Sequence, residues 1–123
     1  MPIHVLFVED EEDLRAVVAD ALSAQGFDVT IASTGIEAIA YLRGEGKFTI
    51  VVTDYSMPGS ATGLDVAVEA ALSQPLAKVV ISSGLQRSQL PVLSENVRFL
   101  PKPYRFRQLT TAIHEQVDCR RGT

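Results

Sequence analysis

Five side chains that could take part in chemistry stand where short apolar runs of the sequence end. They are Glu9, Asp10, Asp54, Ser82 and Lys102. If those runs are parallel strands of an open α/β sheet, their carboxyl ends share one edge, and ligands bind beyond that edge. We therefore expect three carboxylates, a hydroxyl and an ammonium group to lie together.

Crowded carboxylates repel one another, and each raises the pKa of the others unless a positive group joins them. A hard divalent cation can do this, and Mg²⁺ suits a site with few protein ligands and several waters. Lys102 can hold a phosphate as a point charge. A metal, a lysine and a hydroxyl around one carboxylate form an arrangement for phosphoryl transfer, in which that carboxylate attacks phosphorus.

The apolar runs alternate with segments of helical periodicity, which indicates parallel βαβ units with right-handed crossovers. Strands are predicted over residues 3–8, 27–32, 48–53, 78–81 and 97–100. Apolar residues at helical spacing predict helices over residues 14–22, 64–72 and 106–117. Thr34 and Glu37 form a capping-box pattern that begins another helix. Strands without clean polar alternation favour a sheet covered on both faces.

Residues 86–96 interrupt this alternation. A fourth helix is expected there, but Pro91 lies in the middle of the segment, and proline is tolerated only in the first turn of a helix. We therefore expect this helix to be short or irregular.

Composition limits the possible functions. A chain of 123 residues, 46% hydrophobic and 21% charged, fits one globular domain. No apolar run approaches the roughly 18 residues of a membrane span, and the start of the chain lacks a signal-peptide pattern. The net charge of −4 argues against a nucleic-acid surface, and Cys119 alone cannot form an internal disulfide. We expect a single cytoplasmic domain over residues 1–123, with no membrane insertion, no direct nucleic-acid contact and no output domain.

Four motifs, each at a predicted strand end, resemble the response-regulator receiver pattern of two-component signalling. They are residues 5–11 (VLFVEDE), 51–59 (VVTDYSMPG), 81–84 (ISSG) and 100–104 (LPKPY). The motifs occur in the family's order and cover almost the whole chain. The resemblance implies a flavodoxin-like, doubly wound α/β fold with a five-stranded parallel sheet in the order 2-1-3-4-5.

The resemblance also implies a reaction. Asp54 is expected to accept a phosphoryl group from a phosphohistidine of a sensor or hybrid histidine kinase. Asp10 and Asp54 are expected to ligate Mg²⁺ directly, together with the backbone carbonyl of Ser56, while Glu9 acts on the metal through water. The domain would catalyse only its own phosphorylation and the slow hydrolysis of its aspartyl phosphate, so we do not expect a conventional enzyme.

The remaining implied roles concern the phosphoryl oxygens and the output. Ser82 and Lys102 are expected to bind those oxygens, and the Lys102–Pro103 peptide bond is expected to be cis. Ser82 and Phe99 are expected to form a switch in which Phe99 swings inward as the hydroxyl moves. The switch would change a protein-interaction surface, in a monomer or a weak phosphorylation-dependent dimer, for a downstream protein that the sequence leaves open.

The chain departs from the commonest family pattern at several positions. Glu9 stands where Asp is more frequent, and Phe99 stands where Tyr is more frequent. The loop from Asp54 to Gly63 is one residue longer than the commonest spacing. That loop and the LPKPY motif are similar to receivers attached to hybrid histidine kinases, although a stand-alone receiver fits as well.

Two other functions are also consistent with the sequence, as are purely structural roles for several of these residues. The fold could be a docking module that works without phosphorylation, or a small phosphatase with an aspartyl nucleophile. Against the phosphatase, such enzymes usually carry a second Asp where this chain has Ser56, and no Gly-rich phosphate loop follows the first strand. Asp54 could simply cap a turn, Lys102 could be a surface lysine, and Phe99 could be a core residue.

Overall fold

The computed structural model describes residues 3–57, 59, 61–85 and 96–121. Five strands are present: β1 (His4–Val8), β2 (Asp28–Ala32), β3 (Ile50–Asp54), β4 (Lys78–Ser83) and β5 (Val97–Pro101). The described helices are α1 (Glu12–Ala24), α2 (Gly35–Arg43), α3 (Gly63–Ser73) and α4 (Phe106–Arg121). None of these helices has both the length and the apolar character needed to cross a membrane. The short or irregular helix predicted within 86–96 lies, apart from Asn96, outside the described residues.

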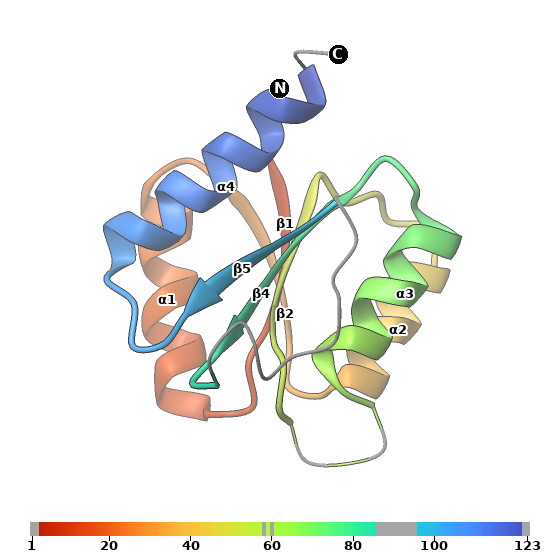
Figure 1. Ribbon diagram of the computed structural model, residues 1–123, viewed down its shortest axis with the longest axis horizontal. Coiled ribbons are helices and arrows are strands. Elements are labelled where there is room, and N and C mark those ends of the chain that lie inside the picture. The colour runs from red at the N-terminus through yellow and green to blue at the C-terminus, as the bar shows by residue number, and fades with distance from the viewer. Residues whose placement is uncertain (1–2, 58, 60, 86–95, 122–123) are drawn as a thin grey trace.

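The strands form one parallel sheet in the order β2-β1-β3-β4-β5. Helices α1 and α4 cover one face of this sheet, and α2 and α3 cover the other (Figure 1). The predicted flavodoxin-like, doubly wound α/β fold is therefore confirmed. The order places β1 and β3 side by side at the centre, and the topology changes direction between them, which is where ligands bind in such sheets.

The hydrophobic core has two layers that share the sheet. On β1, Val5 and Phe7 pack toward α1 and α4, whereas Leu6 and Val8 pack toward α2 and α3. The same alternation continues on the neighbouring strands because successive side chains of a strand point to opposite faces. Both faces are apolar, so the strands appear in the sequence as continuous apolar runs.

Two strand boundaries differ from the sequence prediction by two residues, and the other strand ends agree to within one residue. Strand β3 begins at Ile50, because the backbone N–H of Phe48 donates to the side chain of Gln74 at 2.8 Å. Strand β4 continues past Ile81 through Ser82 and Ser83, which pair with Leu100 and Pro101 on β5. The extension places the Ser82 hydroxyl on a rigid strand.

The helix caps also differ in part from the prediction. Thr34 caps α2 by accepting a hydrogen bond from the backbone N–H of Glu37 at 3.1 Å. The Glu37 carboxylate, however, accepts from the backbone N–H of Ser33 rather than from Thr34. A complete capping box occurs instead at the start of α3, between Thr62 and Asp65. This box fixes the end of the loop that follows Asp54.

Candidate phosphoacceptor site

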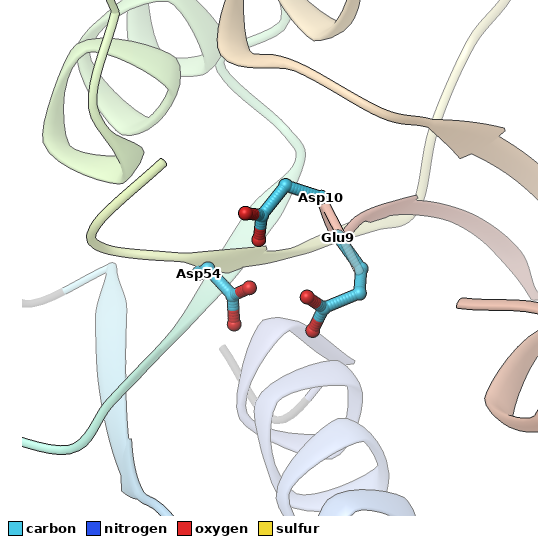
Figure 2. Close-up of side chains that lie close together, drawn as sticks. All are labelled: Glu9, Asp10 and Asp54. Carbon is cyan, nitrogen blue, oxygen red and sulfur yellow. The ribbon is translucent and has the colours of Figure 1, made fainter. Parts of the chain in front are cut away.

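Three carboxylates point toward one another at the carboxyl ends of β1 and β3 (Figure 2). The register pairs Val8 with Thr53, so Glu9 comes to lie beside Asp54. Glu9, Asp10 and Asp54 each offer one carboxylate oxygen within 4.8 Å of the others. Glu9 and Asp54 are buried, and Asp10 is exposed. The cluster therefore opens to solvent on the side of Asp10.

Lys102 brings a positive charge to this cluster from the loop after β5. Its Nζ lies 2.6 Å from Oδ1 of Asp54 and 3.7 Å from Oε1 of Glu9. The backbone N–H of Lys102 donates to the carbonyl of Ser83 at 2.8 Å, which holds the loop against β4. The Lys102–Pro103 peptide bond is cis, as predicted.

Ser82 lies beside Asp54 in the register of β3 and β4. The side chain is buried, and its Oγ has no hydrogen-bond partner among the described residues. Both residues line a cavity of about 250 Å³, together with Lys102, Ser56 and the residues that follow β4. A buried hydroxyl without a partner costs free energy. Its position in the wall of this cavity favours an oxygen-rich ligand as the missing partner.

The charges of the cluster shift the pKa values of its members. Burial, followed by the close approach of the Asp54 carboxyl, raises the pKa of Glu9 to about 7. Burial by itself would lower the pKa of Lys102, but its hydrogen bond and its attraction to Asp54 outweigh this effect and raise that pKa above 10.5. Lys102 is therefore protonated at neutral pH. Glu9 is the carboxyl whose charged form is destabilised by its surroundings in the site.

Two supporting residues were not predicted from the sequence. Arg15 on α1 donates from Nη1 to the backbone carbonyl of Glu9 at 3.0 Å. Gly63, at the start of α3, donates its backbone N–H to the carbonyl of Tyr55 at 2.8 Å. Glycine is a poor helix former, so its place at a helix start could have indicated a close backbone contact. The bond from Arg15 to a carbonyl leaves no signal in the sequence.

The predicted roles of Ser56 and Phe99 stay predictions. Ser56 is exposed and lines the cavity beside Asp54, and the role of its backbone carbonyl stays a prediction. Phe99 is half-buried on β5. Its neighbour Leu100 pairs with Ser82 and packs in the core layer of α1 and α4. Because strand side chains alternate, Phe99 and Ser82 leave the sheet on opposite faces, and the switch role of Phe99 stays a prediction.

The family model for the response regulator receiver domain matches residues 5–114, which include every residue of the site. The chain belongs to this family. It is therefore a receiver domain of two-component signalling, and a role as phosphoacceptor is what the family leads one to expect.

The receiver is similar to proteins of two kinds. It is 33% identical over 119 residues to the sensor kinase CckA of Brucella abortus (strain 2308), covering 93% of this chain and 12% of the kinase. It is 28% identical to the response regulator receiver protein CpdR of the same organism, covering 93% of this chain and 96% of that protein. A two-component response regulator of Oryza sativa subsp. indica is 36% identical, with 59% of its length covered.

Solved structures of receivers also superpose on this chain. A response regulator receiver protein from Sinorhizobium medicae WSM419 superposes with a TM-score of 0.87 at 29% identity, and 97% of each chain is covered. The receiver domain of the hybrid histidine kinase CckA superposes with a TM-score of 0.79 at 31% identity, covering 93% of this chain and 98% of that domain. The likeness thus extends to a response regulator receiver protein and to the receiver domain of a hybrid histidine kinase.

The residues of this receiver fit a divalent cation. Three carboxylate oxygens lie close enough to share one ion, and Oε1 of buried Glu9 has no hydrogen-bond partner among the described residues. An all-oxygen set of this kind suits a hard cation such as Mg²⁺, which members of this family typically bind. Such an ion would also relieve the repulsion that raises the pKa of Glu9.

Proposed function

We propose that this receiver accepts a phosphoryl group on Asp54 from the phosphohistidine of a sensor or hybrid histidine kinase. The observation that carries the proposal is the ion pair of 2.6 Å between Lys102 Nζ and Asp54 Oδ1. It lies at a cavity whose wall holds the hydroxyl of Ser82, which has no hydrogen-bond partner among the described residues. Around one buried carboxylate, the site has a cation, a hydroxyl donor and further acids, and phosphoryl transfer needs such an arrangement.

In the proposed reaction, a carboxylate oxygen of Asp54 attacks phosphorus while the bond from phosphorus to the histidine nitrogen breaks. Lys102 then holds the phosphoryl oxygens, because its ammonium group already lies beside the acceptor. Ser82 donates its O–H, which has no partner within the described part of the chain, to another of these oxygens. The rigid strand ends of β3 and β4 keep the two residues aligned, which lowers the entropic cost of reaching the transition state.

Mg²⁺ would be held by Asp10 and Asp54, with the backbone carbonyl of Ser56, and Glu9 would act on it through water. When bound, the ion neutralises negative charge on the phosphoryl oxygens. The support for this ligand set is the convergence of the three carboxylates in Figure 2 and the unpartnered Oε1 of Glu9.

Signal output would follow from changes around Ser82 and Phe99. Binding of the phosphoryl group satisfies the Ser82 hydroxyl, and we propose that Phe99 on the neighbouring strand repacks in response. This local charge event would bias a protein-interaction surface between two states. The reaction modifies the domain itself and turns over no external substrate.

We also propose a compartment, partners and an assembly state for the domain. The domain works in the cytoplasm, with a histidine kinase or a phosphotransfer protein as donor and a downstream protein as receiver of the signal. It acts as a monomer or a weak phosphorylation-dependent dimer, without direct nucleic-acid contact. Residues 1–123 form one receiver unit, and its similarity to CckA and to CpdR supports either a hybrid-kinase or a stand-alone setting.

The proposal is tested with the purified domain, Mg²⁺ and acetyl phosphate. Intact-mass spectrometry of the wild type should show the addition of one phosphoryl group, and Asp54→Asn should abolish it. Asp20→Asn is a matched control, because Asp20 is an exposed acid on α1. An adduct that survives in Asp54→Asn, or no adduct in the wild type, contradicts the assignment.

A second measurement separates signalling from phosphorylation-independent docking. A partner that binds the wild type and Asp54→Asn with equal affinity, with or without acetyl phosphate, would favour the docking module. Affinity that changes only in the phosphorylated wild type supports the switch.

A further inference from the structure

The cavity of about 250 Å³ beside Asp54 is the acceptor cavity, and a second cavity, the outer cavity, adjoins it. The outer cavity measures about 460 Å³ and is lined by Glu11, Leu14, Gly84, Lys102, Pro103 and Tyr104. Gly84 and Lys102 also line the acceptor cavity, so the two spaces adjoin at these residues. The outer cavity lies between the start of α1 and the loop that joins β5 to α4, which run close together in Figure 1.

Phosphoryl transfer requires space for the leaving group, and the outer cavity lies next to the acceptor cavity. The attacking and leaving atoms lie roughly in line on opposite sides of phosphorus. With Asp54 as the attacking group, the leaving group must lie on the side of phosphorus that faces away from Asp54. The outer cavity meets the acceptor cavity at Gly84 and Lys102, and Asp54 lines only the acceptor cavity.

We propose that this outer cavity is the leaving-group site of the receiver, and that Tyr104 selects a planar imidazole as the leaving group. This inference rests on the proposed phosphorylation of Asp54 and deepens it. The walls are a phenol ring, a proline ring and the side chain of Leu14, which suit the face of a flat aromatic ring. A small acetate group would leave most of these walls without contact.

Tyr104 is held in place for this role. It is partly buried, and it packs against the core layer that also receives Leu14 and Phe106. Burial, with the negative charges of Asp54 and Glu9, raises the pKa of the Tyr104 phenol to about 12. The side chain is therefore neutral at physiological pH and offers a ring wall rather than a competing anion.

Glu11 adds a charge preference at the rim. Its side chain is exposed at the mouth of the outer cavity. In its protonated, cationic form an N-phosphorylated imidazole carries a proton on its other ring nitrogen, and that N–H can donate to a carboxylate. As the P–N bond breaks, its electron pair goes to the ring nitrogen and the ring leaves as neutral imidazole, so no further proton is needed. Acetyl phosphate releases an anion, which the same carboxylate repels.

The test compares two small phosphodonors on the same intact domain at saturating Mg²⁺. Initial rates of phosphorylation are measured by intact mass with N-phosphoimidazole and with acetyl phosphate, and the readout is the ratio of the two rates. Tyr104→Leu keeps an apolar side chain but removes the aromatic face. We expect it to lower the ratio by about three- to tenfold, whereas Tyr104→Phe should keep the ratio of the wild type.

Two further variants sharpen the test. Glu11→Gln should slow the imidazole donor and speed acetyl phosphate, each by about twofold. Tyr41→Ala, at an exposed tyrosine on α2, should leave the ratio unchanged. Opposite shifts of the two donors cannot arise from a general loss of folding.

The inference is overturned if Tyr104→Leu and Glu11→Gln change both donor rates by the same factor, or change neither. That result is distinguishable from failure of the proposed function, in which the wild type takes no phosphoryl group from either donor. If Tyr104→Leu lowers stability too far for kinetics, the opposite shifts expected in Glu11→Gln decide the matter.

Discussion

The fold buries the carboxyl of Glu9 beside a second acid, Asp54, which destabilises its charged form. The backbone N–H of Glu9 donates to Ala32, its carbonyl accepts from Arg15, and its Oε2 accepts from the backbone N–H of Glu11. The second oxygen, Oε1, lies 3.7 Å from Nζ of Lys102 and has no hydrogen bond to any residue that the structure describes. The fold thus holds a buried carboxyl beside Asp54, and the raised pKa of Glu9 records the cost.

This cost predicts a pH dependence of the metal-free domain. Between the unfolded pKa of 4.5 and the folded pKa of about 7, the folded protein binds more protons at Glu9 than the unfolded chain. The free energy of unfolding should therefore fall as pH rises through this window, by up to about 3 kcal/mol. Glu9→Gln should lack this component. Urea unfolding in EDTA across the window measures the difference between the two proteins.

The comparison with Glu9→Gln cancels contributions from histidines, which both proteins share. Parallel stability curves for the two proteins would refute the assignment. Saturating Mg²⁺ should flatten the wild-type curve, because a bound cation favours the ionised carboxylate.

Among the elements, the start of α3 determines the shape of the loop after Asp54. The capping box of Thr62 and Asp65 begins the helix, and Gly63 bonds to the carbonyl of Tyr55. A Cβ added at Gly63 would lie 2.8 Å from the Cα of Tyr55 and closer still to the carbonyl oxygen of Asp54. Helix α3 can approach the end of β3 this closely only because residue 63 has no side chain.

Gly63→Ala should therefore displace the backbone at Asp54. We expect a fall in Mg²⁺ affinity of about tenfold or more and a loss of about 1–3 kcal/mol in stability. Isothermal titration calorimetry with Mg²⁺ and urea unfolding measure the two effects. The control is Gly44→Ala, where the nearest atom to an added Cβ lies 3.4 Å away. Unchanged Mg²⁺ affinity in Gly63→Ala would contradict this account.

A second connection between elements depends on Gln74, which ends α3. Its buried amide accepts from the backbone N–H of Phe48 at 2.8 Å and donates to the carbonyls of Leu42 and Gly46 at 3.1 and 2.7 Å. These bonds hold the segment between α2 and β3 and explain why β3 begins only at Ile50.

Gln74→Ala removes the partner of three backbone groups in one step. We expect a loss of about 2–4 kcal/mol in the free energy of unfolding, because buried groups left without partners are costly. The midpoint of urea unfolding measures it, with the exposed Gln25→Ala as control. Because Gln74 lies at the end of α3 away from Asp54, Mg²⁺ affinity should not change, and a matching loss of affinity would argue against this separation.

At the scale of the whole molecule, the site joins strands that are far apart in the sequence. Glu9 and Asp10 follow β1, Asp54 ends β3, and Lys102 follows β5. The two core layers share one sheet, so the strands are expected to unfold together. A ligand at the site therefore stabilises the entire domain rather than one loop.

Mg²⁺ at ten times its Kd should raise the free energy of unfolding by about 1.4 kcal/mol. For a domain of this size we expect the Tm to rise by about 4–6 °C. Differential scanning calorimetry with and without EDTA measures the shift, and Asp10→Asn should abolish most of it while changing the metal-free Tm little, since Asp10 is exposed. A shift that persists in Asp10→Asn would place the metal elsewhere.

The sequence by itself determined the architecture and predicted which side chains would gather at one edge of the sheet. Continuous apolar runs indicated strands buried on both faces, and the alternation with helices indicated a parallel sheet. The position of Asp54, Ser82 and Lys102 at strand ends then followed, because parallel strands deliver their carboxyl ends to one edge. These inferences needed only local patterns and the periodicity of each element.

Only the tertiary structure decided the contacts between distant residues. Arg15 on the carbonyl of Glu9, Gln74 on the segment after α2 and Gly63 against the acceptor strand depend on distances between elements, which local periodicity does not encode. The outer cavity beside Tyr104 likewise exists only where α1 meets the loop after β5. Tyr104 looks like a packing residue in the sequence, and the role we propose for it arises only because the fold places it in the cavity next to the acceptor cavity.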